Sequence, residues 1–218
     1  LRRLNGAISQ LGFEGFYGSP YEYSAMPREK KIEAMSSCGL HGFQSRTTSG
    51  DANLWCREFE SGTLENPEDF LVPEALYEWS RQGPSTPTSD RVTLTFHEGK
   101  PIAIDTQSMT LTALITRLNS QAGAFGVGRY AGLEHLEHGE KVLEIREAPA
   151  AHLLLDAYRH LETATLDAEL LREKQGLEQI WVREAIEGRW FGGLKAAAEA
   201  FIHHTSQAVS GSVTFTLR

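Results

Sequence analysis

The chain contains several short stretches in which apolar and polar residues alternate. Alternation runs through residues 92–96 and again through 102–104, on either side of Glu98-Gly99. A period of two on both sides of a glycine-containing turn predicts a β-hairpin. Residues 141–146 and 213–217 show the same kind of pattern and are expected to form further strands.

Other stretches place apolar residues three and four positions apart, which predicts amphipathic helices. A helix is also expected to begin at Pro149, because proline in a first turn lacks only an N–H that has no partner there. Residues 66–90 contain four prolines and predict an extended connecting arm. The remaining helical patterns cover residues 1–11, 28–38, 110–122, 164–187 and 193–208.

The order of these elements indicates the fold class. Strands come as hairpins and not as repeated βαβ units, which favours an α+β fold with a mixed or antiparallel sheet and several packed helices. The 218 residues can form a sizeable core.

Composition excludes several classes of function. A formal net charge of −8 argues against nucleic-acid binding, which depends on clustered lysine and arginine. No apolar run reaches the roughly 18 residues that cross a bilayer, so no membrane partner is expected. Cys38 and Cys56 are too few for a disulfide framework, and reduced thiols indicate a cytoplasmic protein.

Two motifs suggest sites, and both have simpler interpretations. Residues 126–131 fit G-x-G-x-x-A, but a dinucleotide site needs a strand before the glycines and a helix after them. Here the preceding segment is helical, so a tight turn is predicted instead. His135 and His138 lie near Glu134 and Glu137, but a metal site needs a further converging ligand. An acidic solvated loop without a metal is the preferred interpretation, and no catalytic residue can be assigned.

Longer stretches of the chain carry a family resemblance. Gly126–Arg129, Glu134 and the run KVLEIREAP at 141–149 fall in register with GVGR, VENR and KSRGIYETP. The stretch SGDANLW at 49–55 is similar to YSxDENLW, and further matches occur at 60–67, 93–104 and 188–191. In these features the chain resembles the synthetase domain of argininosuccinate synthase.

The resemblance implies an activity. That family is an ATP-dependent carbon–nitrogen ligase of arginine biosynthesis, which joins aspartate to citrulline through an adenylated intermediate. ATP with Mg is the expected cofactor, and a homotetramer is the expected assembly. Residues 1–40 would be the remnant of a nucleotide-binding domain with a connecting helix, and residues 41–218 a synthetase-like domain.

The family holds citrulline with five side chains, and the resemblance carries three of them to this chain. Arg3 corresponds to the arginine that binds the carboxylate, Ser49 to the first serine and Glu134 to the glutamate. Glu58 stands where the second serine is expected, and Arg146 where a tyrosine is expected. We expect these two either to pair with each other or to adapt the site to a different, anionic acceptor.

The family's SGGxDTS-type phosphate loop does not occur in these 218 residues. Several functions therefore stay open. The chain is part of a ligase with altered acceptor specificity, including one of specialised metabolism, or the ligand-binding half of a split ligase with a separate ATP-binding polypeptide. Alternatively it is a non-catalytic subunit or pseudoenzyme that retains the fold.

Overall fold

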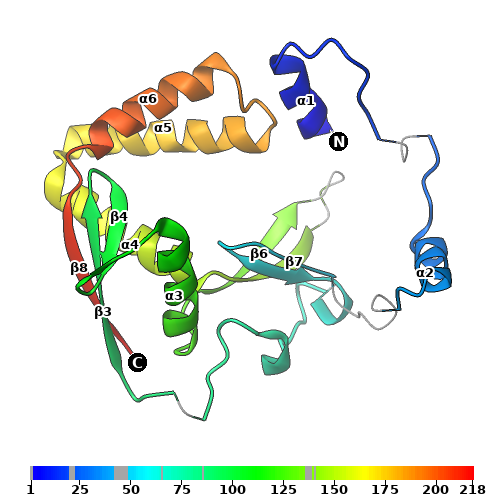
Figure 1. Ribbon diagram of the computed structural model, residues 1–218, viewed down its shortest axis with the longest axis horizontal. Coiled ribbons are helices and arrows are strands. Elements are labelled where there is room, and N and C mark those ends of the chain that lie inside the picture. Colours follow the sequence, from blue (N-terminus) through cyan, green and yellow to red (C-terminus); the bar gives the residue numbers. More distant parts are fainter. Residues whose placement is uncertain are drawn as a thin grey trace. The chain divides into compact units, whose positions relative to one another are not determined.

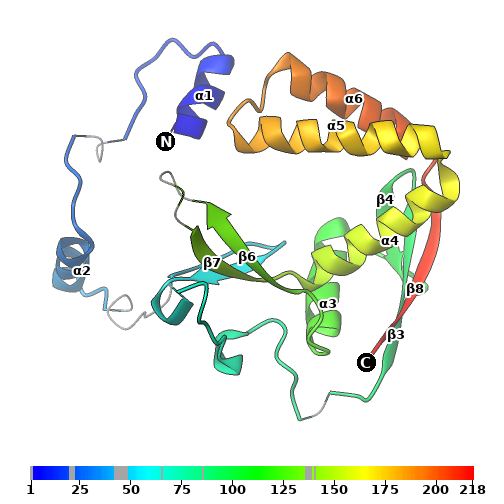
Figure 2. The same ribbon diagram turned by 180° about the vertical axis from the view of Figure 1, so that it is seen from behind.

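A computed structural model describes residues 2–19, 23–41, 49–64, 66–84, 86–135, 139 and 141–218. Within these residues the chain forms helices and two four-stranded antiparallel sheets, which confirms the predicted α+β class (Figures 1 and 2). No helix in the described part of the chain is long and apolar enough to cross a membrane.

The chain divides into two compact units, each built from two separate stretches of sequence. Residues 1–45 and 166–207 form the first unit, and residues 46–165 and 208–218 form the second. The origin of residues 1–40 in a nucleotide-binding domain stays a prediction. Helices of the first unit are α1 (Arg2–Gln10), α2 (Arg28–Ser37), α5 (Ala168–Ile186) and α6 (Gly193–Ser206).

The first unit is held together by contacts between its two sequence stretches. The Gln10 side chain on α1 donates to the Gly188 carbonyl at 2.9 Å and accepts from the Phe191 N–H at 3.0 Å. Trp181 and Trp190 pack edge to face, and the Lys195 ammonium lies 4.3 Å from the Trp190 ring centre. The Gln10 hydrogen bonds join α1 to the segment between α5 and α6, and the Trp190 contacts join that segment to both of these helices.

The second unit contains a sheet that includes the hairpin expected from residues 92–104. Its strand order is β5 (Gln107–Ser108), β4 (Lys100–Ile104), β3 (Asp90–His97) and β8 (Gly211–Leu217). Glu98 and Gly99 both have positive φ, as in the turns whose twist suits a hairpin. Helices α3 (Leu111–Gly123) and α4 (Pro149–Thr165) also belong to this unit and confirm two predicted helices.

The other sheet of the second unit was only partly predicted. Its order is β1 (Ser49–Ala52), β2 (Arg57–Glu60), β7 (Lys141–Glu147) and β6 (Arg129–His135). Only β7 was expected from the sequence. Strands β1 and β2 were not predicted, and the segment interpreted as an acidic loop contains β6 up to His135. As far as His135 the loop interpretation was wrong, because the hydrogen bonds to β7 supply regular structure that the polar sequence of β6 does not indicate. Residues 136–138 lie outside the described part of the chain.

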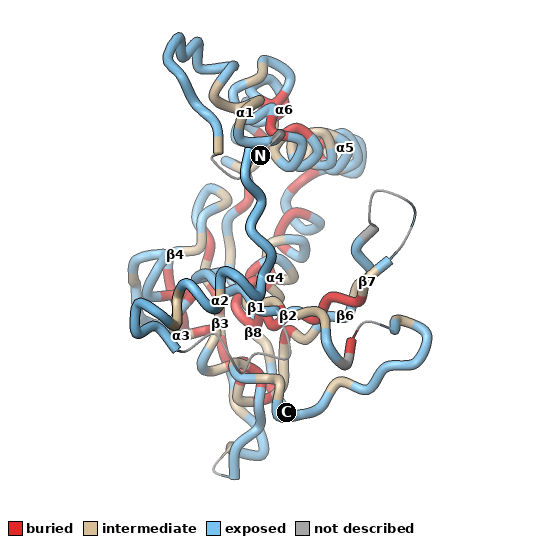
Figure 3. The backbone as a smooth tube through the Cα atoms, turned by 90° about the vertical axis from the view of Figure 1, so that its right-hand side faces the viewer, coloured by how far each residue is buried: buried red, intermediate tan, exposed pale blue. Residues whose placement is uncertain are grey.

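One face of this sheet is the core of the region. Phe59, Leu143 and Ile145 are almost fully buried together with Leu64. Each such side chain contributes about 1.5–3 kcal/mol through burial. Successive residues of a strand point to opposite faces, so the alternate positions of β2 and β7 face away from this core. The buried stretch of β7 can be followed in red in Figure 3.

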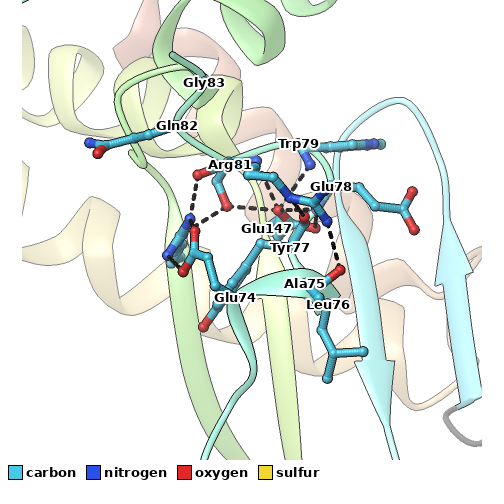
Figure 4. A network of polar contacts seen from close by, with 12 residues as sticks. Glu74, Ala75, Leu76, Tyr77, Glu78, Trp79, Arg81, Gln82, Gly83 and Glu147 are labelled. Atoms are coloured by element: carbon cyan, nitrogen blue, oxygen red, sulfur yellow. Dashed lines mark hydrogen bonds and ion pairs between the residues drawn. The ribbon is translucent and has the colours of Figure 1, made fainter. Parts of the chain in front are cut away.

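A buried carboxylate attaches residues 74–82 to the sheet (Figure 4). Glu147, whose side chain has no exposed surface, accepts from the backbone N–H groups of Glu78, Trp79 and Ser80 at 2.8–3.0 Å. The Ser80 hydroxyl donates at 2.7 Å, and Arg57 Nη1 donates to the second oxygen at 2.7 Å. Burial raises the pKa of Glu147, but these hydrogen bonds outweigh burial and hold the pKa below its ordinary value.

The arginine that follows the glycine-rich turn belongs to the same network. Arg129 forms a fork with both oxygens of Glu74 at 2.9 and 2.6 Å. Its Nε donates to the Ser80 hydroxyl at 3.0 Å, and its guanidinium lies 3.8 Å from the centre of the Tyr77 ring. Arg129 therefore holds the extended arm against the sheet, which is a structural role.

The glycine-rich turn lies between α3 and β6, in the helix-before, strand-after context that argued against a dinucleotide site. Gly126 and Gly128 both have positive φ. A Cβ atom on Gly128 would lie 2.6 Å from backbone atoms of Ala148 and Pro149. The turn is therefore packed against the start of α4, as expected of glycines that allow close backbone approach.

This packing predicts the effect of a substitution. Gly128→Ala should lower the free energy of unfolding by at least about 2 kcal/mol, because it adds backbone strain and a clash with a rigid neighbour. Chemical denaturation measures the change. Gly132→Ala is the matched control, since nothing lies within 4 Å of its added Cβ. Equal effects of the two substitutions would contradict this description of the turn.

Candidate functional site

The face of the β1-β2-β7-β6 sheet opposite the Phe59 core carries polar side chains. Residues that lie opposite each other on neighbouring strands share a face. Asp51 pairs with Glu58, Glu58 with Arg146, and Arg146 with Tyr130. We call this set the polar face; its members are Ser49, Asp51, Glu58, Glu60, Tyr130, Glu134, Glu144 and Arg146.

Two of the residues implied by the resemblance lie on the polar face. Ser49 is on edge strand β1 and Glu134 on the opposite edge strand β6, and both are exposed. Three strand spacings separate their backbones, about 14 Å in total. Only a ligand that lies across β2 and β7 could contact both side chains.

The third implied residue belongs to a different part of the chain. Arg3 is exposed on α1, in the first compact unit, and its carbonyl lies against Gly188. Its convergence with Ser49 and Glu134 on one ligand stays a prediction.

The two altered positions contact each other. Arg146 Nε donates to Glu58 Oε2 at 2.6 Å, and Arg146 Nη2 contacts the Glu144 carboxylate. Pairing is the first of the two expectations for these positions, and the contact bears it out; adaptation of the site to an anionic acceptor stays a prediction. The hydrogen bond to Glu58 raises the pKa of Arg146, and the negative charges of Glu144 and Glu58 raise it further. Burial acts in the opposite direction but is outweighed. The guanidinium is therefore a permanent cation at the centre of an acidic face.

The polar face also contains carboxylates that the sequence reasoning did not select. Ligand oxygens of Glu60, Glu134 and Glu144 lie within 4.8 Å of one another. Burial raises the pKa of Glu144, and the neighbouring carboxylates add to the increase although Arg146 opposes it. Such a group of oxygens suits a hard cation such as Mg²⁺. The three carboxylates come together only through the register of β2, β7 and β6, which the sequence did not predict.

The histidine interpretation falls mostly outside what the structure describes. Glu137 and His138 are not among the described residues, and nothing is described of the His135 side chain. The absence of a metal site stays a prediction.

Comparison with known proteins decides the family. Residues 48–218 match the family described as the arginosuccinate synthase C-terminal domain. The chain belongs to the argininosuccinate synthase family. This confirms the family resemblance found in the sequence.

Two relatives show how much of the family protein is present. The argininosuccinate synthase of Rubrobacter xylanophilus is 40% identical over 170 residues, which are 78% of this chain and 41% of the relative. The argininosuccinate synthase of Parasynechococcus marenigrum is 34% identical over 218 residues, which are 99% of this chain and 54% of the relative. The chain thus spans about half the length, or less, of these curated relatives.

The family homology suggests use of ATP, but the glycine-rich turn of this chain does not suit a nucleotide. A triphosphate needs open backbone N–H groups, usually at a glycine-rich loop before a helix. In the described part of the chain, the glycine-rich turn precedes a strand, and Gly128 packs closely on Ala148 and Pro149. These residues do not fit a phosphate cradle, and no step through ATP is assigned to them.

Proposed function

We propose that this chain is the acceptor-binding portion of an argininosuccinate-synthase-like ligase. The whole enzyme would use ATP with Mg to join aspartate to a citrulline-like acceptor through an adenylated intermediate, and the ATP phosphates would be bound outside the described residues. The acceptor specificity would differ from that for citrulline. Family membership supports the reaction class, and a homo-oligomer in the cytoplasm is the expected form of the enzyme.

The observation that carries this proposal is the arrangement of the polar face. Ser49, Glu58, Glu134 and Arg146 lie on one face of one sheet, and they include both unchanged and altered acceptor positions. In this proposal Glu134 accepts hydrogen bonds from acceptor nitrogens, and the Ser49 hydroxyl contacts the opposite end. Arg146 adds a guanidinium that a neutral ureido group does not require.

The charges of the polar face define the change in specificity. An acceptor must either contact the Glu58–Arg146 pair from outside or displace Glu58 from Arg146. An anionic group on the acceptor could replace the Glu58 carboxylate at Arg146, while a neutral group could not. We therefore expect an acceptor that carries an additional carboxylate.

A second candidate function is a non-catalytic subunit or pseudoenzyme. It is favoured by the same ion pair. Glu58 and Arg146 bind each other and not a ligand, at two positions where the family has a serine and a tyrosine hydroxyl group. Under this alternative the polar face would bind no acceptor.

Release of pyrophosphate by the intact protein separates the two functions. The assay supplies ATP, Mg and aspartate with a panel of ureido and amide amino acids, including analogues with an additional carboxylate. We expect release that requires both aspartate and an acceptor, is fastest with an anionic acceptor, and falls at least tenfold in Glu134→Gln. Absence of release with every acceptor would refute the ligase proposal and favour the non-catalytic alternative.

A further inference from the structure

A cleft lies beside the polar face, within the second compact unit. Its volume is about 690 Å³, and strands β6 and β7 and helix α4 contribute to its lining. We call it the α4 cleft; the residues that matter here are Trp55, Tyr130, Arg146, His152, Asp156 and Arg159. Ser49, Glu58 and Glu134 do not line it, so it is distinct from the proposed acceptor contacts except for the shared Arg146.

Two charged side chains in the cleft have opposite signs and suitable spacing. Asp156 and Arg159 are three residues apart on α4, which places them one turn apart on the same side of the helix. Among the described residues, neither side chain has an ion pair or hydrogen bond. Both charges act on the hydroxyl of Tyr130: burial raises its pKa, Asp156 raises it further, and Arg159 lowers it. An anion and a cation therefore face the same small volume.

Apart from the Arg146 guanidinium, which is paired with Glu58, the remaining lining supplies neutral hydrogen-bonding groups and apolar surface. The Tyr130 hydroxyl lies 2.5 Å from His152 Nδ1, and the two rings are 5.8 Å apart between centres. Trp55 and Leu155 are exposed apolar side chains at the same cleft. Pockets of 300–1,000 Å³ with apolar walls and a few converging polar groups are typical of small-molecule sites.

We propose that the α4 cleft binds a free α-amino acid. Its ammonium contacts Asp156, its carboxylate contacts Arg159 through charge-assisted hydrogen bonds, and its side chain packs toward Trp55. An α-amino acid carries both charges on one carbon, which matches two opposite charges one helical turn apart. This site goes beyond the proposed function, because it adds a second amino-acid site next to the one on the polar face.

Calorimetric titration of the intact protein tests the proposal with the twenty standard L-amino acids and L-citrulline as probes. For the amino acid that binds best, the matching amine and the matching deaminated acid are titrated as well. We expect each of these two analogues to bind at least about tenfold more weakly than the amino acid, because each lacks one charge. Failure of every amino acid to bind with at least millimolar affinity would overturn the proposal.

Two substitutions assign the charges. Asp156→Asn should weaken the binding of the amino acid and of the amine about tenfold and leave the affinity for the deaminated acid unchanged. Arg159→Gln should weaken the binding of the amino acid and of the deaminated acid and leave the affinity for the amine unchanged. Thermal denaturation checks that both variants stay folded, and Arg91→Gln, an exposed arginine outside the cleft, is the control that should change nothing.

Other outcomes would contradict the assignment. If neither substitution changes the affinity, the two side chains are only surface charges and the cleft is not the site. If affinity falls in Glu134→Gln but not in Asp156→Asn, the amino acid is bound on the polar face. That result would overturn the cleft proposal and leave the proposed function standing.

Discussion

Replacing Glu147 with glutamine should lower the free energy of unfolding by about 3–5 kcal/mol, the range for breaking a buried ion pair from one side. The carboxylate is fully buried and accepts from three backbone N–H groups, a hydroxyl and Arg57. The glutamine amide has the same shape but only one acceptor oxygen. Its NH₂ group would face N–H or O–H donors that now bind the second carboxylate oxygen. It also leaves Arg57 without its buried partner.

Chemical denaturation of Glu147→Gln measures this effect, and Glu78→Gln is the matched control. Glu78 pairs with the same arginine at 2.7 Å, but its side chain is 64% exposed. Removing that charge should cost no more than about 1 kcal/mol, the usual range for exposed pairs. A loss in Glu147→Gln no larger than in the control would contradict the role of Glu147 as the anchor of residues 74–82.

The lowered pKa of Glu147 also predicts how stability depends on pH. A carboxyl group whose pKa is lower in the folded state contributes stability above its unfolded pKa, and this contribution is lost as the pH falls through the folded pKa. The wild-type protein should therefore lose stability in acid more steeply than Glu147→Gln. Parallel slopes for the two proteins across the acid range would contradict this assignment.

The second large effect concerns acceptor recognition. Glu58 and Arg146 replace a serine and a tyrosine, and Glu144 stands where the resembled pattern KSRGIYETP has glycine. All three are joined through Arg146. The variant Glu58→Ser, Glu144→Gly, Arg146→Tyr should bind citrulline at least about tenfold more tightly than the wild type, because two hydroxyl hydrogen bonds of about 1 kcal/mol each would be regained.

The single substitution Arg146→Tyr is the informative control for this variant. It leaves Glu144, with a side chain only 9% exposed, without its cation among neighbouring carboxylates. It should therefore be less stable than the triple variant in thermal denaturation, and it should gain little affinity for citrulline. Equal citrulline affinity of the wild type and the triple variant would contradict the claim that these three residues set specificity.

The sequence predicted the parts of the fold that have strong periodicity. The hairpin around Glu98-Gly99 alternates clearly, and α3 and α4 bury regular apolar stripes, so local pattern and tertiary structure agree. Strands β1 and β2 have only four residues each, and β1 is exposed throughout. β2 is held by pairing with β7 across a long sequence separation, and β1 is held only through its pairing with β2. A local pattern reveals neither pairing.

The candidate site was predicted through resemblance and not through pattern. Ser49, Glu134, Glu58 and Arg146 were selected in that way, and the Glu58–Arg146 pair was one of two expectations. Glu60 and Glu144 were missed because their proximity to Glu134 depends on the register of three strands. Asp156, Arg159 and Tyr130 were missed for a similar reason, since a helix and a strand must meet before they line one cleft.

We propose that the Glu58–Arg146 pair has changed which acceptor the polar face binds. Calorimetric titration of the unmodified intact protein with L-citrulline tests it most directly. We expect no binding in the micromolar range, and micromolar binding of citrulline would contradict a change in acceptor specificity.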